Sequence, residues 1–255
     1  MSATILPPCC GVIPARYEST RFPGKPLAEI RGKPMFWHVY TRAMQCPEFQ
    51  QVVIATEDSR IAEAAEALEV PVLMTRSDHK SGTDRVQEAA GYLNMDDRSV
   101  IVNIQGDEPL LEPAMLSAMI GPFKHPEIAV TTLAHPMDTD SAQNPDRVKV
   151  AFAPDGCALY FSRAPIPYPR DGRDADYHCH IGLYAFRKSA LDRFVALGPG
   201  RLEQIEKLEQ LRLLEAGIPI HVVLTENKSI SVDRPEDLAR VLAIIDEAKR
   251  QESNR

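Results

Sequence analysis

Short apolar runs alternate with segments of helical periodicity along the first half of the chain. Four continuous runs predict buried strands, at 9–13, 52–55, 71–74 and 100–104. Three segments with apolar residues at helical spacing predict helices between them, at 34–44, 61–68 and 86–93. Strands that are apolar without alternation are covered on both faces. This half therefore predicts an α/β fold with a mostly parallel central sheet and helices on both faces.

The alternation of predicted strands and helices ends at about residue 125. Four short apolar runs with little helix between them predict an antiparallel extension of the sheet, at 128–133, 148–152, 158–161 and 183–186. Prolines and polar residues over 165–176 indicate an irregular surface excursion. Helical periodicity returns at 202–216 and 235–250, on either side of a strand at 220–224. We expect one domain over 1–255, with a smaller antiparallel lobe at about 134–190.

Composition narrows the class of protein. The 255 residues carry 29 Lys and Arg against 36 Asp and Glu, a net charge of −7, which disfavours nucleic-acid binding. No apolar stretch reaches the length of a membrane helix, so we expect no membrane partner. The five cysteines form no Cys-x-x-Cys pair, which favours free thiols in a reducing compartment such as the cytoplasm.

Basic residues gather in one segment of this acidic chain, directly after the first predicted strand. Arg16, Arg21 and Lys25 lie within ten residues of one another, and Gly24 indicates a tight turn before Lys25. The carboxyl end of a strand is where open α/β sheets bind ligands. A basic surface turn is the plain interpretation; an anion site, best suited to a polyphosphate, is the functional one.

Two acidic residues are candidates for a metal site. Asp107, in the segment 105–109, follows the most clearly predicted strand, and Asp233 lies just before the last helix. Mg²⁺ prefers one or two carboxylates together with phosphate oxygens. An aspartate in a strand-to-helix turn is equally common without a metal. Asp233 with Glu236 also predicts a capping box at the helix start, and the sequence does not separate capping from metal binding.

Two other polar segments contain candidate ligand-binding residues. The loop 76–84 contains Ser81 and Gly82, which would let the backbone approach a flat ligand. His-Cys-His at 178–180 invites a zinc interpretation, but alternate residues of one strand face opposite sides and no second Cys/His cluster exists. Common hydrolase, zincin and dinucleotide-binding motifs are absent from the sequence.

Six motifs then occur in order: Pro14-Ala-Arg-x-x-Ser-Thr-Arg-x-Pro-Gly-Lys-Pro-Leu27, Arg76-x-Asp-His-x-Ser-Gly-Thr83, Asn103-x-Gln-Gly-Asp-Glu-Pro109, Tyr160-Phe-Ser-Arg163, His180-x-Gly-x-Tyr184 and Leu208-Glu-Gln-Leu-Arg212. Together they closely resemble the 3-deoxy-manno-octulosonate cytidylyltransferases, the CMP-Kdo synthetases, from about residue 11 to 242. The resemblance implies a Rossmann-like fold of the glycosyltransferase-A type. It also implies transfer of CMP from CTP to the acidic eight-carbon sugar 3-deoxy-D-manno-octulosonate (Kdo), with release of pyrophosphate, for lipopolysaccharide synthesis. A homodimer that uses the smaller lobe is a further implication.

The resemblance also assigns roles position by position. Catalysis falls to Lys25, Arg16 and Asp107. The nucleotide-binding set is Ala15, Arg16, Arg21, Lys25, Arg76, Ser81, Gly82 and Gln105. The sugar-binding set is Arg163, His180, Tyr184, Glu209 and Gln210. Asp107 and Asp233 would bind Mg²⁺.

Three alternatives stay open at this point. The acceptor could be a related acid, such as an amino-Kdo or a sialic-acid-like sugar. A glycosyltransferase that uses a finished sugar nucleotide would carry an Asp-x-Asp motif, for which Asp138-Thr-Asp140 fits the letters. A silent nucleotide-sensing subunit is the third, and intact Lys25 and Asp107 speak against it.

Overall fold

The computed structural model describes residues 6–18, 21–172, 175–227 and 230–253. The chain forms two compact units, each assembled from three segments. We call them the β1 unit (Cys10–Asn94, Asn103–Pro113 and Ser229–Arg255) and the β7 unit (Met1–Cys9, Met95–Val102 and Ala114–Lys228).

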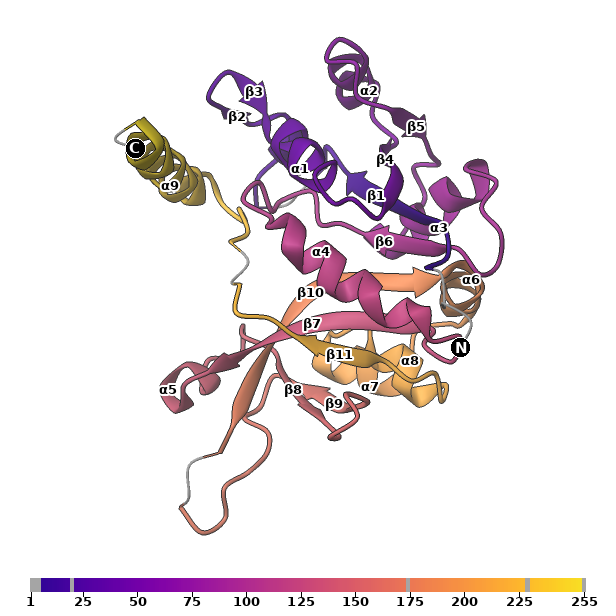
Figure 1. The fold of residues 1–255 in the computed structure, drawn as a ribbon, viewed down its shortest axis with the longest axis vertical. Helices are drawn as coiled ribbons and strands as arrows, with labels where there is room; N and C mark the ends of the chain where they lie inside the picture. The colour runs from indigo at the N-terminus through magenta and orange to yellow at the C-terminus, as the bar shows by residue number, and fades with distance from the viewer. Residues whose placement is uncertain (1–5, 19–20, 173–174, 228–229, 254–255) are drawn as a thin grey trace. The chain divides into compact units, whose positions relative to one another are not determined.

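The β1 unit contains the parallel part of the fold predicted for the first half. Its strands are β1 (Cys9–Ala15), β4 (Phe49–Thr56) and β5 (Val72–Met74), in the order β1-β4-β5. Its helical elements and short hairpin are η1 (Lys25–Leu27), β2 (Glu29–Ile30), β3 (Lys33–Pro34), α1 (Met35–Ala43), α2 (Ser59–Glu66) and α3 (Gly82–Tyr92) (Figure 1). β4 and β5 pair in parallel, with Ile54 opposite Val72. The strands and helices predicted for this stretch are confirmed.

Helix α3 begins ahead of the predicted start at Val86. Ser81 accepts a hydrogen bond from the Asp84 amide while the Asp84 carboxylate accepts one from the Ser81 amide, which is a capping box. This reciprocal pair satisfies two backbone donors at the helix start, so the helix nucleates at Gly82. Ser81 and Asp84 are three residues apart, which is the spacing of a capping box, so the earlier start has a signal in the sequence.

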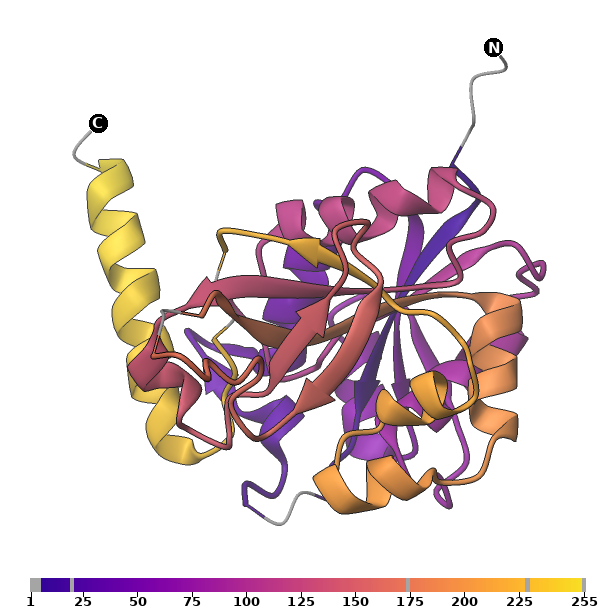
Figure 2. The same ribbon diagram turned by 90° about the horizontal axis from the view of Figure 1, so that it is seen from below.

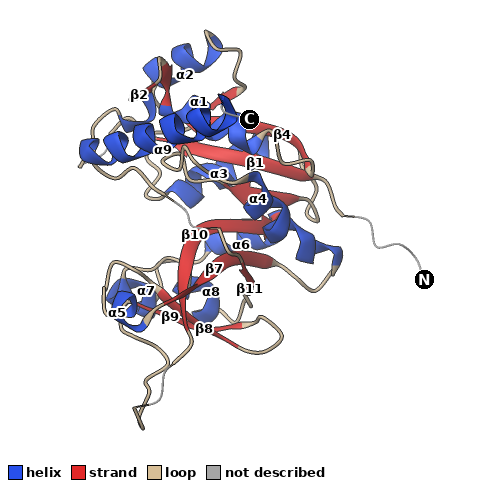
Figure 3. Cartoon of the chain, turned by 60° about the vertical axis from the view of Figure 1, so that its left-hand side comes forward, coloured by secondary structure: helices blue, strands red, loops and turns tan. Residues whose placement is uncertain are grey.

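Helix α9 (Pro235–Ser253) also belongs to the β1 unit. Its apolar face packs on a buried cluster that includes Ile30 and Met35, next to α1 (Figure 3). The helix residues in this contact are Leu238, Val241, Leu242 and Ile245. The predicted stripe of apolar residues along this helix is therefore confirmed as its packing face.

The β7 unit contains the predicted antiparallel region. Its strands are β6 (Val100–Asn103), β7 (Val130–Met137), β8 (Lys149–Phe152), β9 (Ala158–Ser162), β10 (Tyr177–Arg187) and β11 (His221–Leu224). They lie in the order β11-β7-β10-β6, and β8 pairs with both β10 and β9. β10 is antiparallel to β7 and β8, and β8 is antiparallel to β9, as Figure 2 shows for the β8–β9 pair. The predicted antiparallel extension is confirmed.

The β7 unit also contains several helices. One predicted helix is interrupted, and two of the observed helices were not predicted. The helices are α4 (Pro113–Ile120), η2 (Gly121–Lys124), α5 (Thr139–Ala142), α6 (Lys188–Ala196), α7 (Arg201–Glu206) and α8 (Leu211–Glu215). The single helix predicted over 202–216 is wrong, because Lys207 adopts a left-handed conformation (φ 55°) that ends α7. α4 and α6 were not predicted; α4 is apolar on most of its surface, so its sequence shows little periodicity.

None of the helices in the described residues is long and apolar enough to cross a membrane. The single domain with a lobe at about 134–190 stays a prediction.

Candidate functional site

A hydrogen bond at Gly24 joins the basic segment to the chain just after β1. Gly24 adopts a left-handed conformation (φ 70°), and its amide donates to the Tyr17 carbonyl at 2.8 Å. A Cβ on Gly24 would lie 3.2 Å from the Tyr17 ring in a backbone conformation that other residues rarely adopt, so glycine suits this position. Lys25 follows as the first residue of η1. Ser19 and Thr20, which complete the first motif, lie outside the described residues.

The acidic loop after residue 103 packs against the same strand end. A Cβ on Gly106 would lie 2.9 Å from the Pro14 carbonyl oxygen, so only glycine allows this close approach. The Asp107 carbonyl accepts a hydrogen bond from the Val232 amide at 2.9 Å. The backbone itself therefore brings the segment that carries Asp233 beside Asp107.

Four predicted residues meet where these three loops come together. The Lys25 Nζ lies 2.6 Å from Asp107 Oδ2 and 3.8 Å from Asp233 Oδ1. Arg21 lies on the outer side, with a guanidinium nitrogen 3.1 Å from the same Asp233 oxygen. Lys25 and Asp107 are largely buried, while Arg21 is exposed. The structure thus places two cations and two carboxylates at one point of the β1 unit.

This cluster fits a divalent cation. The two carboxylates come from separate loops and converge on one ammonium group, which shows that a positive charge is stabilised between them. Their oxygen atoms are the ligands that Mg²⁺ prefers, and Mg²⁺ needs few protein ligands when substrate phosphates supply others. In the part of the chain that the structure describes, no three His, Cys, Asp or Glu side chains form a metal-binding group. A cation here would therefore depend on oxygens from the ligand.

The helix cap at the start of α9 differs from the prediction. The Asp237 carboxylate, and not that of Glu236, accepts hydrogen bonds from the backbone amides of Asp233 and Arg234, each at 2.9 Å. These bonds lower the pKa of Asp237. The Asp233 carboxylate faces Arg21 and Lys25 instead. The predicted box of Asp233 with Glu236 is wrong, since the helix is capped one residue further on.

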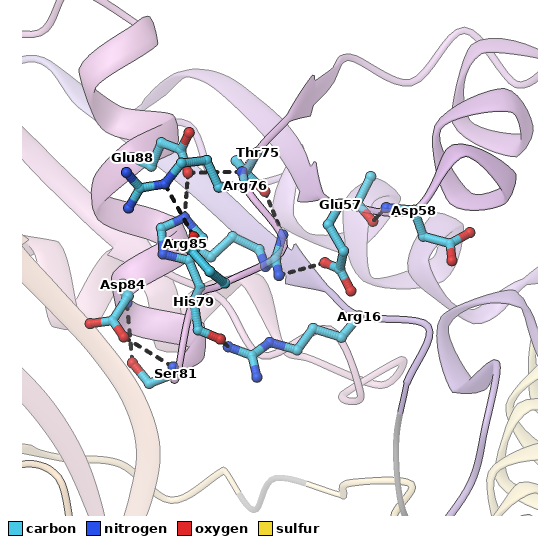
Figure 4. Close-up of polar contacts among 12 residues, drawn as sticks. Arg16, Glu57, Asp58, Thr75, Arg76, His79, Ser81, Asp84, Arg85 and Glu88 are labelled. Atoms are coloured by element: carbon cyan, nitrogen blue, oxygen red, sulfur yellow. Dashed lines mark hydrogen bonds and ion pairs between the residues drawn. The ribbon is translucent and has the colours of Figure 1, made fainter.

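Arg16, at the end of β1, points toward the loop that precedes α3. Its guanidinium donates to the His79 carbonyl at 3.0 Å (Figure 4). Its Nε is buried and has no hydrogen-bond partner among the described residues. The Ser81 hydroxyl is occupied by the capping box, while Arg76 is exposed and pairs with Asp78 at 3.2 Å. The predicted nucleotide residues Ala15, Arg16, Arg21, Lys25, Arg76, Ser81, Gly82 and Gln105 all lie in the β1 unit.

The residues assigned to the sugar lie in the β7 unit, and they are of a different kind. His180, on β10, has its Nε2 2.9 Å from the Thr132 hydroxyl. Its ring packs against Phe161 and Tyr184, with ring centroids 5.0 and 5.4 Å away. Burial lowers the pKa of His180 to about 3. The imidazole is therefore neutral near pH 7 and can offer both a donor and an acceptor.

Tyr184 and Gln210 extend this buried neutral surface. Burial, with a smaller contribution from Glu209, raises the pKa of Tyr184 well above its usual value, so the phenol keeps its proton. Gln210 is 7% exposed, and its side-chain Nε2 has no hydrogen-bond partner among the described residues. An unsatisfied buried amide costs free energy, which a ligand with hydroxyl groups would recover.

Arg163 is held by the backbone. Its guanidinium donates to the carbonyls of Glu206, Pro145 and Lys207 at 2.7, 3.0 and 3.5 Å. An arginine side chain has more N–H groups than these three bonds use. The charge of Arg163 is thus oriented by carbonyl dipoles and keeps donors for a carboxylate.

Lys149 is a buried residue of the β7 unit that the sequence reasoning missed. It is fully buried, and its Nζ donates to the carbonyls of Arg163 and Asn144 at 2.6 and 3.0 Å. Burial lowers its pKa. The available signal was a single charged residue within the apolar strand predicted at 148–152, which called for an internal partner.

Comparisons with known proteins show what this chain is similar to. Residues 10–229 match the family model described as cytidylyltransferase. The 3-deoxy-manno-octulosonate cytidylyltransferase of Oleidesulfovibrio alaskensis is 59% identical over 241 residues, covering 94% of this chain and 97% of that protein. The protein of the same name from Nitratidesulfovibrio vulgaris is 57% identical over 243 residues, covering 94% and 96%.

A solved structure of a CMP:2-keto-3-deoxy-manno-octonic acid synthetase complexed with CTP superposes with a TM-score of 0.90 at 41% identity. The match covers 94% of this chain and 99% of that one. The α/β fold with a mostly parallel central sheet and a smaller antiparallel part is thereby confirmed.

Proposed function

This chain belongs to the family of 3-deoxy-manno-octulosonate cytidylyltransferases, which are nucleotidyltransferases, and we propose that it couples CTP to Kdo to give CMP-Kdo and pyrophosphate. The observation that carries the proposal is the convergence of Lys25, Asp107 and Asp233 in the β1 unit. Phosphates and a divalent cation are the ligands that such a cluster of opposite charges suits.

The reaction is a substitution at phosphorus. The anomeric hydroxyl of the sugar attacks the α-phosphorus of CTP and loses its proton to solvent. The bond between the α-phosphorus and the oxygen that bridges to the β-phosphate breaks, and pyrophosphate leaves with that oxygen. Transfer of this kind depends on positioning and electrostatic stabilisation and needs no protein nucleophile. In the proposal Lys25 and Arg16 neutralise the triphosphate, and Arg21 stays near them at the exposed side.

Mg²⁺ is part of the proposal, with Asp107 and Asp233 as its protein ligands. When bound, it would polarise the phosphate oxygens and offset charge that develops during transfer. The pair of carboxylates supports this assignment, because both face one positive charge in the structure. The nucleotide itself would be held by Ala15, Arg16, Arg21, Lys25, Arg76, Ser81, Gly82 and Gln105.

The acceptor set in the proposal is Arg163, His180, Tyr184, Glu209 and Gln210. Arg163 would pair with the sugar carboxylate through its remaining N–H groups. The neutral His180, the protonated Tyr184 and the unsatisfied amide of Gln210 suit hydroxyl groups. A site built to hydrogen-bond such groups rejects ligands that lack them.

We also propose a cytoplasmic location, a homodimer and a place in lipopolysaccharide precursor synthesis. The location is supported by the five cysteines, all of which are free. The dimer and the pathway rest on the family resemblance.

The test is pyrophosphate release by the purified chain with Mg²⁺, Kdo and each nucleoside triphosphate in turn. We expect release with CTP, with at least tenfold less from the other nucleotides. An amino-Kdo and a sialic acid, each offered with CTP, test the acceptor. Faster turnover of either acid than of Kdo would overturn the assignment of Kdo, and absence of release with all acids would overturn the enzyme assignment.

A further inference from the structure

Glu88, on the second turn of α3, collects three hydrogen-bond donors that come from two elements. Its carboxylate accepts from the Arg76 amide at 3.1 Å and from the Tyr92 hydroxyl at 2.6 Å. It also contacts the His79 Nε2 (Figure 4). Burial raises the pKa of Glu88, but the bonds from Tyr92, His79 and the Arg76 amide outweigh it and lower the pKa to about 2. The carboxylate is therefore ionised at any pH near neutrality.

Two of these three donors belong to the loop between β5 and α3. The bonds to Arg76 and His79 attach the loop to the helix, and the capping box of Ser81 with Asp84 attaches its far end. The His79 side chain is 6% exposed, so the attachment is shielded from water. Hydrogen bonds to a charged group are among the stronger ones in proteins, and they strengthen further when shielded.

The backbone of the same loop orients Arg16. The His79 side chain contacts Glu88 while the His79 carbonyl accepts from the Arg16 guanidinium at 3.0 Å. One residue therefore connects the helix carboxylate to the cation at the end of β1. Movement of His79 would change the direction in which Arg16 points.

A carbonyl partner leaves the charge of Arg16 available. The neighbouring Arg85 is fully buried, and a carboxylate neutralises it: Glu57 lies 2.5 Å from its guanidinium. No carboxylate among the described residues lies within ion-pairing distance of Arg16. A carbonyl dipole fixes the guanidinium without cancelling its charge, which is what an anion-binding arginine requires.

We propose that Glu88 is a positioning residue for CTP, which acts by fixing His79 and, through the His79 carbonyl, the Arg16 guanidinium. The inference rests on the proposed function, in which Arg16 binds the CTP phosphates. Glu88 touches no substrate in this proposal.

The test compares three variants by calorimetric binding of CTP with Mg²⁺ in the absence of sugar. Glu88→Ala removes the acceptor of all three bonds, and His79→Ala keeps the carbonyl but removes the side-chain attachment. Both are expected to weaken CTP binding about tenfold, with the KM for Kdo changed less than about threefold. Tyr92→Phe removes only the donor from the helix, so its CTP affinity should stay within about twofold of the wild type.

The same substitutions in an Arg16→Ala background separate positioning from general damage. If Glu88 acts through Arg16, Glu88→Ala adds less than about twofold to the loss caused by Arg16→Ala. A full tenfold loss in that background, or unchanged CTP binding in both single variants, would overturn the proposal. Should Glu88→Ala fail to fold, His79→Ala decides by the same criteria.

Hydrogen exchange of the ligand-free protein gives a readout that does not depend on activity. The Arg76 amide should exchange at least tenfold faster in Glu88→Ala than in Tyr92→Phe. Equal exchange in the two variants contradicts the attachment of the loop. Failure of the proposed function has another signature, since wild-type protein would then release no pyrophosphate from CTP and Kdo.

Discussion

The candidate residues of the β1 unit are mostly charged, whereas several of those in the β7 unit are buried and uncharged. In the β1 unit the side chains are ionised and paired, as in the contacts of Lys25 with Asp107 and of Arg21 with Asp233. In the β7 unit burial removes charge: it lowers the pKa of His180 to about 3 and raises that of Tyr184 well above its usual value. One group of residues is organised by ion pairs and the other by burial.

The difference matches the two substrates of the proposed reaction. A triphosphate is recognised mainly through its charge, for which cationic side chains and a divalent ion are suited. A sugar acid carries one charge and several hydroxyls, and hydroxyls are distinguished by neutral donors and acceptors at fixed positions. Arg163 supplies the charged contact in the β7 unit.

The largest expected effect is in the charged group of residues. Asp107→Asn keeps the shape of the side chain but removes the charge that faces Lys25. We expect kcat for pyrophosphate release to fall at least about 100-fold, roughly 2.7 kcal/mol in the barrier. Asp246→Asn, which affects an aspartate on α9 paired with Arg31, is the control and should stay within about twofold. Retention of a tenth of the wild-type rate by Asp107→Asn would remove this residue from the metal role.

A substitution at Gln210 tests the uncharged residues of the β7 unit that are assigned to the sugar. Gln210→Leu removes the unsatisfied amide at similar volume, so thermal stability should stay equal or rise slightly. The KM for Kdo should rise about 10- to 50-fold because hydroxyl contacts are lost, while the KM for CTP stays within about twofold. Gln204→Leu, at an exposed position of α7, is the control. A larger change in the KM for CTP than in the KM for Kdo would contradict the proposal that the β7 unit holds the residues that bind Kdo.

A substitution at Lys25 tests whether Asp107 and Asp233 can hold a divalent ion. Its ammonium occupies the space between the two carboxylates, so it competes with a divalent ion in protein that lacks nucleotide. Lys25→Met should therefore bind Mn²⁺ about tenfold more tightly without CTP, measured by electron paramagnetic resonance, and should bind CTP more weakly. Lys33→Met, elsewhere in the same unit, should leave Mn²⁺ binding unchanged. Weaker Mn²⁺ binding by Lys25→Met would show that the carboxylates do not hold the ion.

The smallest expected effect concerns pH and the buried histidine. Burial lowers the pKa of His180 from 6.5 to about 3. Between these two pH values His180 is therefore protonated in the unfolded chain and neutral in the folded chain. The stability that depends on neutral His180 is present above pH 6.5 and is lost as the pH falls toward 3. When the pH falls from 7 to 5.5, the free energy of unfolding measured in urea should decrease by about 1 kcal/mol more for the wild type than for His180→Gln. Identical pH dependence would show that the imidazole is not held neutral.

Much of the fold could be predicted from local pattern. The run at 52–55 is apolar throughout and the run at 100–104 is apolar except for Asn103, and strands β4 and β6 lie there. The basic turn and the acidic loop each follow a strand directly, which predicts their place at a strand end before any contact is known. That reasoning led to Lys25 and Asp107, whereas Asp233 was a candidate from the start of the last helix and from the family resemblance. The structure brings the three side chains together. The roles assigned to these residues stay predictions.

Other features depend on contacts that no local pattern contains. Lys207 interrupts a segment of good helical periodicity with a backbone conformation that its side chain does not favour. Lys149 is charged and fully buried because two carbonyls distant in sequence face it. The attachment of His79 to Glu88, and through it the orientation of Arg16, crosses three elements. Sequence spacing constrains neighbours along one helix or strand, whereas these partners are set by tertiary packing.

The packing of α9 has a consequence for how variants of this enzyme are interpreted. Val232, next to Asp233, is buried in the same apolar cluster as Val241 and Leu242. The position of a proposed metal ligand thus depends on hydrophobic contacts made roughly two helical turns into α9. A cavity-forming change such as Leu242→Ala should therefore lower turnover by displacing the proposed metal ligand, although every polar side chain is intact.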